Sequence, residues 1–160
     1  MLGYYKNDEE TNKVLKDGWF NTGDLGYFDN DGYLFISGRK KNVIVLKNGK
    51  NIFPEELEIL VSALPFVAEN IVYGKPEPNG DLKLCVKIVY KPEVMKEMFK
   101  DTSKDKYHDV IWKEIKNINK TMPTYKHIRE LIVTDEELIK TTTQKVKRQE
   151  EIKRILNQDK

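Results

Sequence analysis

Residues 18–46 read GWFNTGDLGYFDNDGYLFISGRKKNVIVL, and this stretch combines two strand-like runs with a turn and a basic segment. The runs at residues 25–28 and 33–37 are rich in aromatic and aliphatic side chains. Between them lies Asp29-Asn30-Asp31-Gly32, a cluster of residues that tolerate the positive φ angles of tight turns. The pattern predicts a β-hairpin.

The predicted hairpin brings two charged residues together at its open end. Asp24 stands just before the first run and Arg39 just after the second. A carboxylate accepts hydrogen bonds from hydroxyl groups and a guanidinium donates them in a fixed fork, so the pair suits a vicinal diol such as a ribose. The same two residues also fit a plain surface salt bridge, which is common and weak.

Composition bounds the class of protein. The chain has 160 residues, a formal net charge of +2 and 34% charged residues, and it has no apolar run that approaches the length of a membrane span. We therefore expect no nucleic-acid partner and no transmembrane segment. Cys85 is the only cysteine and lies in an apolar run, which excludes an internal disulfide framework and favours a reducing, cytoplasmic location.

The remainder of the chain predicts an α+β fold, with a small three-stranded sheet covered by helices and preceded by the hairpin as an appendage. Pro54 suits the first position of a helix, whose apolar face is predicted from Leu57, Leu60, Val61 and Leu64. The predicted strands are residues 43–46, 67–73, 82–90 and 128–133, and the further predicted helices are residues 93–99 and 107–119. The last segment is basic from Lys140 to Arg154, and Ile152, Ile155 and Leu156 give it an amphipathic helical character.

Four ordered stretches of the chain resemble the C-terminal part of the adenylate-forming superfamily, which includes acyl-CoA synthetases, luciferases and peptide-synthetase adenylation domains. The stretch from Gly18 to Asp24 is similar to the ribose-binding motif of that superfamily, and the stretch from Gly32 to Lys41 is similar to its hinge motif. The stretches Met122-Pro123-Thr124-Tyr125 and Lys140–Arg148 resemble its two last motifs. Residues 38–56 look most like bacterial long-chain fatty-acid CoA ligases.

The resemblance implies a division of the chain. Residues 1–38 would be the end of a large N-terminal AMP-binding domain, residues 39–42 a hinge, and residues 43–160 a mobile C-terminal domain. It also implies that Asp24 and Arg39 hold the ribose hydroxyls of ATP or AMP. Lys41 would be the pivot about which the small domain turns, since hinges are changes of φ and ψ at a few residues.

Lys145 matches the lysine of the last motif. The resemblance implies that its ammonium stabilises the charge that develops when a substrate carboxylate attacks the α-phosphate of ATP. Without the resemblance, Lys145 reads as one more solvated basic side chain. Two neighbours depart from the pattern, because Ile139 and Gln144 stand where the broad family usually has Pro and Gly.

Gly49 matches a loop that approaches the pantetheine of CoA, and it also reads simply as a turn glycine. The resemblance implies ATP and CoA as substrates, a fatty acid or other carboxylate as the acyl donor, and Mg²⁺ held mainly by the missing N-terminal domain. The phosphate-binding segments of that domain are absent, so we expect this chain to be an inactive fragment by itself. The alternatives are a stand-alone, non-catalytic binding or regulatory module with the same fold, and another adenylate-forming enzyme such as a peptide-synthetase adenylation domain.

Overall fold

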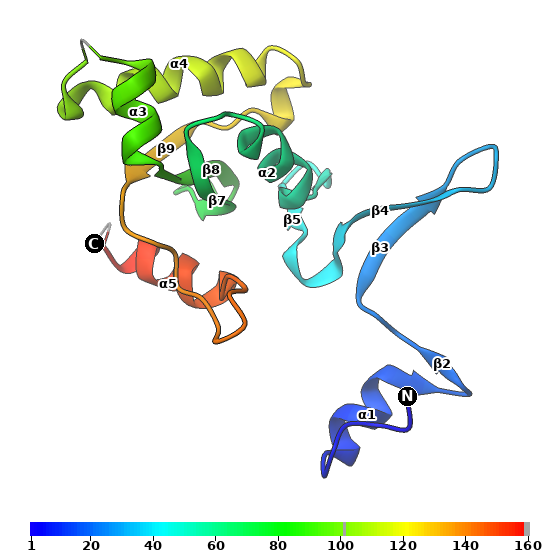
Figure 1. Cartoon of the computed structure of the whole chain (residues 1–160). Helices are drawn as coiled ribbons and strands as arrows, with labels where there is room; N and C mark the ends of the chain where they lie inside the picture. The colour runs from blue at the N-terminus through cyan, green and yellow to red at the C-terminus, as the bar shows by residue number, and fades with distance from the viewer. Residues whose placement is uncertain (101, 159–160) are drawn as a thin grey trace. The chain divides into compact units, whose positions relative to one another are not determined.

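The computed structural model describes residues 1–100 and 102–158, which divide into two compact units, Met1–Val43 and Ile44–Lys160. Figure 1 shows the elements of each unit. Most of the exposed large hydrophobic side chains lie in the first 36 residues, and the buried core lies in the second unit. The two units therefore differ in how much of their apolar surface they bury.

The first unit begins with a short helix that the sequence reading missed. Helix α1 (Asp8–Val14) starts at Asn7, whose side chain accepts a hydrogen bond from the backbone of Glu10 at 3.0 Å. Its first turn is acidic, which complements the helix dipole. Strands β1 (Leu15–Lys16) and β2 (Trp19–Phe20) follow as a small antiparallel pair.

The predicted hairpin is confirmed as β3 (Asp24–Phe28) and β4 (Leu34–Arg39). Asp29 organises the turn, since its side chain accepts hydrogen bonds from the backbone of Asp31 and Tyr33 at 3.0 and 2.8 Å. The register shifts between Leu25 and Gly26, because Leu25 pairs with Gly38 and Gly26 with Ile36. A Cβ atom at Gly26 would lie 2.5 Å from the backbone oxygen of Phe35, so the two strands approach too closely there for any other residue.

The second unit is built on the predicted three-stranded sheet, in the order β7-β8-β9. Strand β8 (Leu82–Tyr90) pairs antiparallel with β7 (Val67–Pro76) and parallel with β9 (Glu130–Thr134). A small hairpin of β5 (Ile44–Val45) and β6 (Asn51–Ile52) precedes the sheet. The helices are α2 (Pro54–Ser62), α3 (Pro92–Met98), α4 (Tyr107–Asn119) and α5 (Arg148–Gln158).

Helices cover both faces of this sheet (Figure 1). Alternate residues of β8, from Leu84 to Tyr90, pack with α2, α3 and α4 in the larger core. Cys85 and Val89 point to the other face, where Ile155 of α5 and Leu138 of the segment after β9 complete a smaller core. The α+β fold with a helix-covered three-stranded sheet is confirmed, and the middle strand is buried on both sides.

One detail of the predicted helix faces is wrong. Leu57 and Val61 of α2 are buried as expected, but Leu60 is 42% exposed. Leu60 therefore lies outside the buried face of α2, and helical spacing marked one residue too many.

We predict that Ile115→Ala in α4 lowers the free energy of unfolding of the second unit by about 2–5 kcal/mol, because it leaves a cavity in the larger core. Ile115 is fully buried, whereas Ile59 in α2 is 71% exposed. The matched variant Ile59→Ala should change the free energy by no more than about 0.5 kcal/mol. Urea unfolding followed by circular dichroism measures both, and equal losses would contradict the assignment of the core.

Candidate functional site

Asp24 and Arg39 lie opposite one another at the open end of the β3–β4 hairpin, as the sequence predicts. The Nε atom of Arg39 is 2.7 Å from Oδ1 of Asp24. Another guanidinium nitrogen, Nη1, donates to the backbone oxygen of Thr22 at 3.3 Å. The Arg39 side chain is 61% exposed and that of Asp24 29% exposed. The hairpin thus presents an accessible acceptor and an accessible donor side by side, which is the arrangement that a diol requires.

A pocket of about 520 Å³ lies within the first unit, next to this pair. Its lining includes Thr22, Gly23, Arg39 and Lys41. Lys41 is exposed and stands in a short 3₁₀ helix, Lys40–Asn42, which the backbone of Lys40 joins to Gly23 by a hydrogen bond of 2.9 Å. The basic segment therefore follows directly on the Asp24–Arg39 pair.

Gly49 lies in the loop that connects β5 to β6. It has a φ of 77°, and a Cβ atom added there would meet nothing within 4 Å. The loop is attached to the β7–β8 connection, because Asp81 Oδ1 accepts hydrogen bonds from the backbone of Lys47 and Leu82 at 2.9 and 2.8 Å. These bonds hold the pKa of Asp81 below its ordinary value, so the loop has an ionised anchor at neutral pH.

Lys145 lies in a second hairpin of this unit, formed by residues 139–147. Lys140 and Val146 form an isolated antiparallel bridge, and the backbone of Lys147 donates to the oxygen of Ile139 at 2.7 Å. The Lys145 side chain is exposed. An ammonium group on this loop is accessible to a ligand.

Four connections of the chain share one pattern of turn hydrogen bonds. Each is a segment of five residues in which the N–H of the first residue donates to the carbonyl oxygen of the fifth. The carbonyl oxygen of the first residue accepts from the N–H of the fourth, and the fourth residue has a positive φ. This is the arrangement of a hairpin turn with a left-handed residue before a bulge. The fourth residues are Gly32, Gly49, Gly80 and Gln144. Gln144 alone of the four carries a side chain, and its φ is 63°.

The structure brings Asp24 and Arg39 together in the first unit, and it places Gly49 and Lys145 in two separate hairpins of the second. The sequence reading missed the buried pair Lys87 and Glu151, whose ammonium and carboxylate are 2.7 Å apart. It also missed Glu69, which binds the residues leading to the Lys145 hairpin. Their signal in the sequence is weak, because Lys and Glu are the commonest surface residues.

Within residues 1–100 and 102–158 there is no group of three or more His, Cys, Asp or Glu side chains placed to hold a metal ion. None of the described helices has the length and apolar character needed to cross a membrane.

The sequence of the chain is similar to a known protein family and to several known enzymes. The family model described as the AMP-binding enzyme C-terminal domain matches residues 41–157. The chain is 46% identical over 76 residues to the long-chain-fatty-acid–CoA ligase FadD15 of Mycobacterium tuberculosis, covering 48% of this chain and 13% of that protein. It is 41% identical over 87 residues to the indoleacetate–CoA ligase of Aromatoleum aromaticum, covering 54% of this chain and 17% of that protein.

Among solved structures, the anthranilate CoA ligase AuaEII in complex with anthranoyl-AMP matches with a TM-score of 0.76 and 26% identity. The match covers 97% of this chain and 28% of that one. The chain thus spans less than a third of the length of each of these proteins.

We predict that Gln144→Gly raises the free energy of unfolding of the second unit, by up to about 1 kcal/mol, because glycine adopts a positive φ without the steric cost of a Cβ atom. Thr143→Gly, at the preceding position of the same turn, should lower it, since glycine only adds freedom to the unfolded chain there. Thermal unfolding measures the two changes. Destabilisation by both variants would contradict the described conformation of Gln144.

Proposed function

Because the chain belongs to the family of AMP-binding enzyme C-terminal domains, we propose that it forms the C-terminal portion of a cytoplasmic, ATP-dependent acyl-CoA synthetase. In the first half-reaction a carboxylate oxygen attacks the α-phosphorus of ATP and pyrophosphate leaves. In the second, the thiol sulfur of CoA attacks the acyl carbon, the thiol proton is lost and AMP leaves. A larger N-terminal portion would complete the site and hold Mg²⁺.

The family match carries this proposal, and the relatives support a choice of substrate. The similarity to a protein named a long-chain-fatty-acid–CoA ligase supports a long-chain fatty acid as the carboxylate. The indoleacetate and anthranilate ligases supply the competing acids for a direct comparison of rates.

The Asp24–Arg39 pair supports a role in holding the nucleotide. In the proposal, Asp24 accepts hydrogen bonds from the ribose hydroxyls and Arg39 donates to them, replacing part of the contact of 2.7 Å that the two side chains make with each other. Each ribose hydroxyl would then make a charge-assisted hydrogen bond, which is stronger than a bond between two neutral groups.

Lys145 is proposed to act in the first half-reaction. The attacking carboxylate and the triphosphate are both anions, and an ammonium between them stabilises the charge that develops as the bond to pyrophosphate breaks. The exposure of Lys145 on a hairpin supports this role, since the group reaches a ligand without unfolding of the core. Lys41 is proposed as the pivot that moves this hairpin into and out of the nucleotide site.

Gly49 is proposed to line the path of the CoA thiol in the second half-reaction. The open space around its missing Cβ atom and its positive φ support this role, because they leave room beside the backbone of the loop.

The proposal is tested in a chimera in which residues 1–160 replace the corresponding C-terminal portion of the Mycobacterium tuberculosis ligase. Lys145→Ala should lower ATP–pyrophosphate exchange by roughly 10²–10³-fold, the usual effect of removing one group that stabilises transition-state charge. Lys147→Ala, two residues away and also exposed, serves as the matched control and should keep the exchange rate of the parent chimera.

The isolated 160-residue chain should show no exchange, since in this proposal a larger N-terminal portion supplies the rest of the site. Exchange by that chain, or an unchanged rate in the Lys145→Ala chimera, would refute the assignment. An inert but correctly folded parent chimera would favour the stand-alone binding module.

The variants Gly49→Ala and Gly80→Ala test whether Gly49 has a role in the CoA path beyond its role in a turn. Both positions have a φ near 77° and open space for a Cβ atom, so each variant should lose about 1 kcal/mol of stability. In the chimera, thioester formation from acyl-AMP and CoA should slow in Gly49→Ala and not in Gly80→Ala. Equal rates in the two variants would remove Gly49 from the CoA path.

A further inference from the structure

A buried ion pair lies on the α5 face of the sheet, outside the residues assigned above. Lys87 is 4% exposed and Glu151 is fully buried. Lys87 stands in the middle strand, opposite Ile71 of β7 and Ile132 of β9. In the part of the chain that the structure describes, no other charged side chain is buried to this degree.

Stability alone does not explain this pair. Removing two charges from water is costly, and replacing a buried ion pair by hydrophobic residues of similar size is often neutral or stabilising. Burial alone would raise the pKa of Glu151, but the hydrogen bonds from Lys87 and from the backbone of Ile139 outweigh it and lower that pKa. The carboxylate is therefore ionised at neutral pH. One of its oxygens accepts from Lys87, and the other is available to a second donor.

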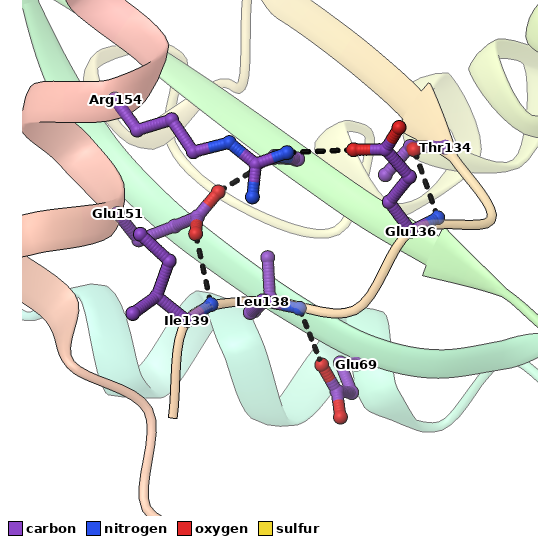
Figure 2. A network of polar contacts seen from close by, with 8 residues as sticks. Glu69, Thr134, Glu136, Leu138, Ile139, Glu151 and Arg154 are labelled. Atoms are coloured by element: carbon purple, nitrogen blue, oxygen red, sulfur yellow. Dashed lines mark hydrogen bonds and ion pairs between the residues drawn. The ribbon is translucent and has the colours of Figure 1, made fainter. Parts of the chain in front are cut away.

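The second donor is the backbone N–H of Ile139. Figure 2 shows Glu151 reaching from α5 to the N–H of Ile139, which donates to Oε2 at 2.9 Å. The oxygen of Ile139 accepts from Lys147 at 2.7 Å. Both polar groups of Ile139 are thus bonded, one to α5 and one across the hairpin that carries Lys145.

A second carboxylate holds the preceding residue. Leu138 donates its N–H to Oε2 of Glu69 at 3.0 Å (Figure 2), and Lys140 pairs with the same carboxylate. The other end of the hairpin is held by Arg148, which donates to the backbone oxygen of Val72 at 2.7 Å and pairs with Glu58. The base of the hairpin is therefore bound on both sides, while the hydrogen bonds that the structure describes for the turn with Lys145 join residues of that turn.

We propose that Glu151, held in place by Lys87, is a positioning residue for Lys145: its buried carboxylate fixes Ile139 and so sets where the 139–147 hairpin stands on the sheet. This inference rests on the proposed function for its catalytic consequence. Its structural part is that the buried carboxylate orders the hairpin and not the rest of the sheet, and this part does not depend on the proposed function.

The double variant Lys87→Met with Glu151→Leu tests the structural part in the 160-residue chain. It removes the bond to Ile139 without leaving a buried charge unpaired. Native-state amide hydrogen exchange should then be at least roughly tenfold faster at Thr141, Gln144 and Lys147, whose N–H groups bond within the hairpin. Amides in the middle of β8 should keep their protection.

The control is Lys126→Gln with Glu56→Gln, which removes an ion pair of 2.6 Å between α2 and the segment before β9. Exchange in the hairpin should stay as in the parent chain. Lys87→Met with Glu151→Gln provides a second test, because the amide oxygen can still accept the N–H of Ile139 while no buried charge is left unpaired; its hairpin amides should exchange at rates between those of the parent and the first double variant.

Three results would overturn the proposal. They are unchanged exchange in the hairpin, equal acceleration in the hairpin and in β8, and failure of the double variant to fold, which would make the ion pair a requirement of the fold itself.

In the chimera, the double variant should lower kcat for adenylation by roughly ten- to a hundredfold with little change in KM for ATP, because misplacing a catalytic group slows the chemical step more than binding. Altered hairpin exchange with unchanged kcat would overturn the catalytic consequence. If Lys145→Ala is also without effect, the proposed function fails while the exchange result still decides the structural part.

Discussion

The buried contact between Glu151 and Lys87 is the interaction that joins the sheet of the second unit to the hairpin that carries Lys145. Strand β8 is buried on both faces, so a lysine in its middle requires an anion, and α5 supplies it. Once the carboxylate is there, its other oxygen determines the position of Ile139. A single buried carboxylate thus connects the middle of the sheet to the base of an exposed loop, whereas an apolar pair would leave the N–H of Ile139 without this acceptor.

The Gly49 loop and the Lys145 hairpin of the second unit have the same kind of turn but different attachments. The Gly49 loop depends on Asp81, which bonds two backbone N–H groups beside the β7–β8 connection. The Lys145 hairpin depends on Glu69 and Glu151 at its base. In both cases a carboxylate fixes the backbone and leaves the tip exposed. This arrangement suits loops that meet ligands, because the rigid part lies in the fold and the reactive part in solvent.

Much of this fold follows from local sequence. Asp29-Asn30-Asp31-Gly32 predicts the turn that places Asp24 beside Arg39, and both ends of α4 were predicted correctly. Helix α1 was missed because it is short and buries no residue, so it has no apolar period to detect. The parallel pairing of β9 with β8 depends on contacts between distant segments, and no local pattern encodes it. Helical spacing predicts Leu60 as buried although it is 42% exposed. The burial of Glu151 could not be predicted, because nothing near it in the chain distinguishes it from a surface glutamate.

The central claim is that Lys145 serves adenylation and not thioester formation, and single-turnover rates of the two half-reactions test it most directly. In the Lys145→Ala chimera, formation of acyl-AMP from ATP and the carboxylate should fall by about 10²-fold or more, while conversion of supplied acyl-AMP and CoA to thioester should proceed at the parent rate. Equal loss in both half-reactions, or no loss in the first, would contradict the account.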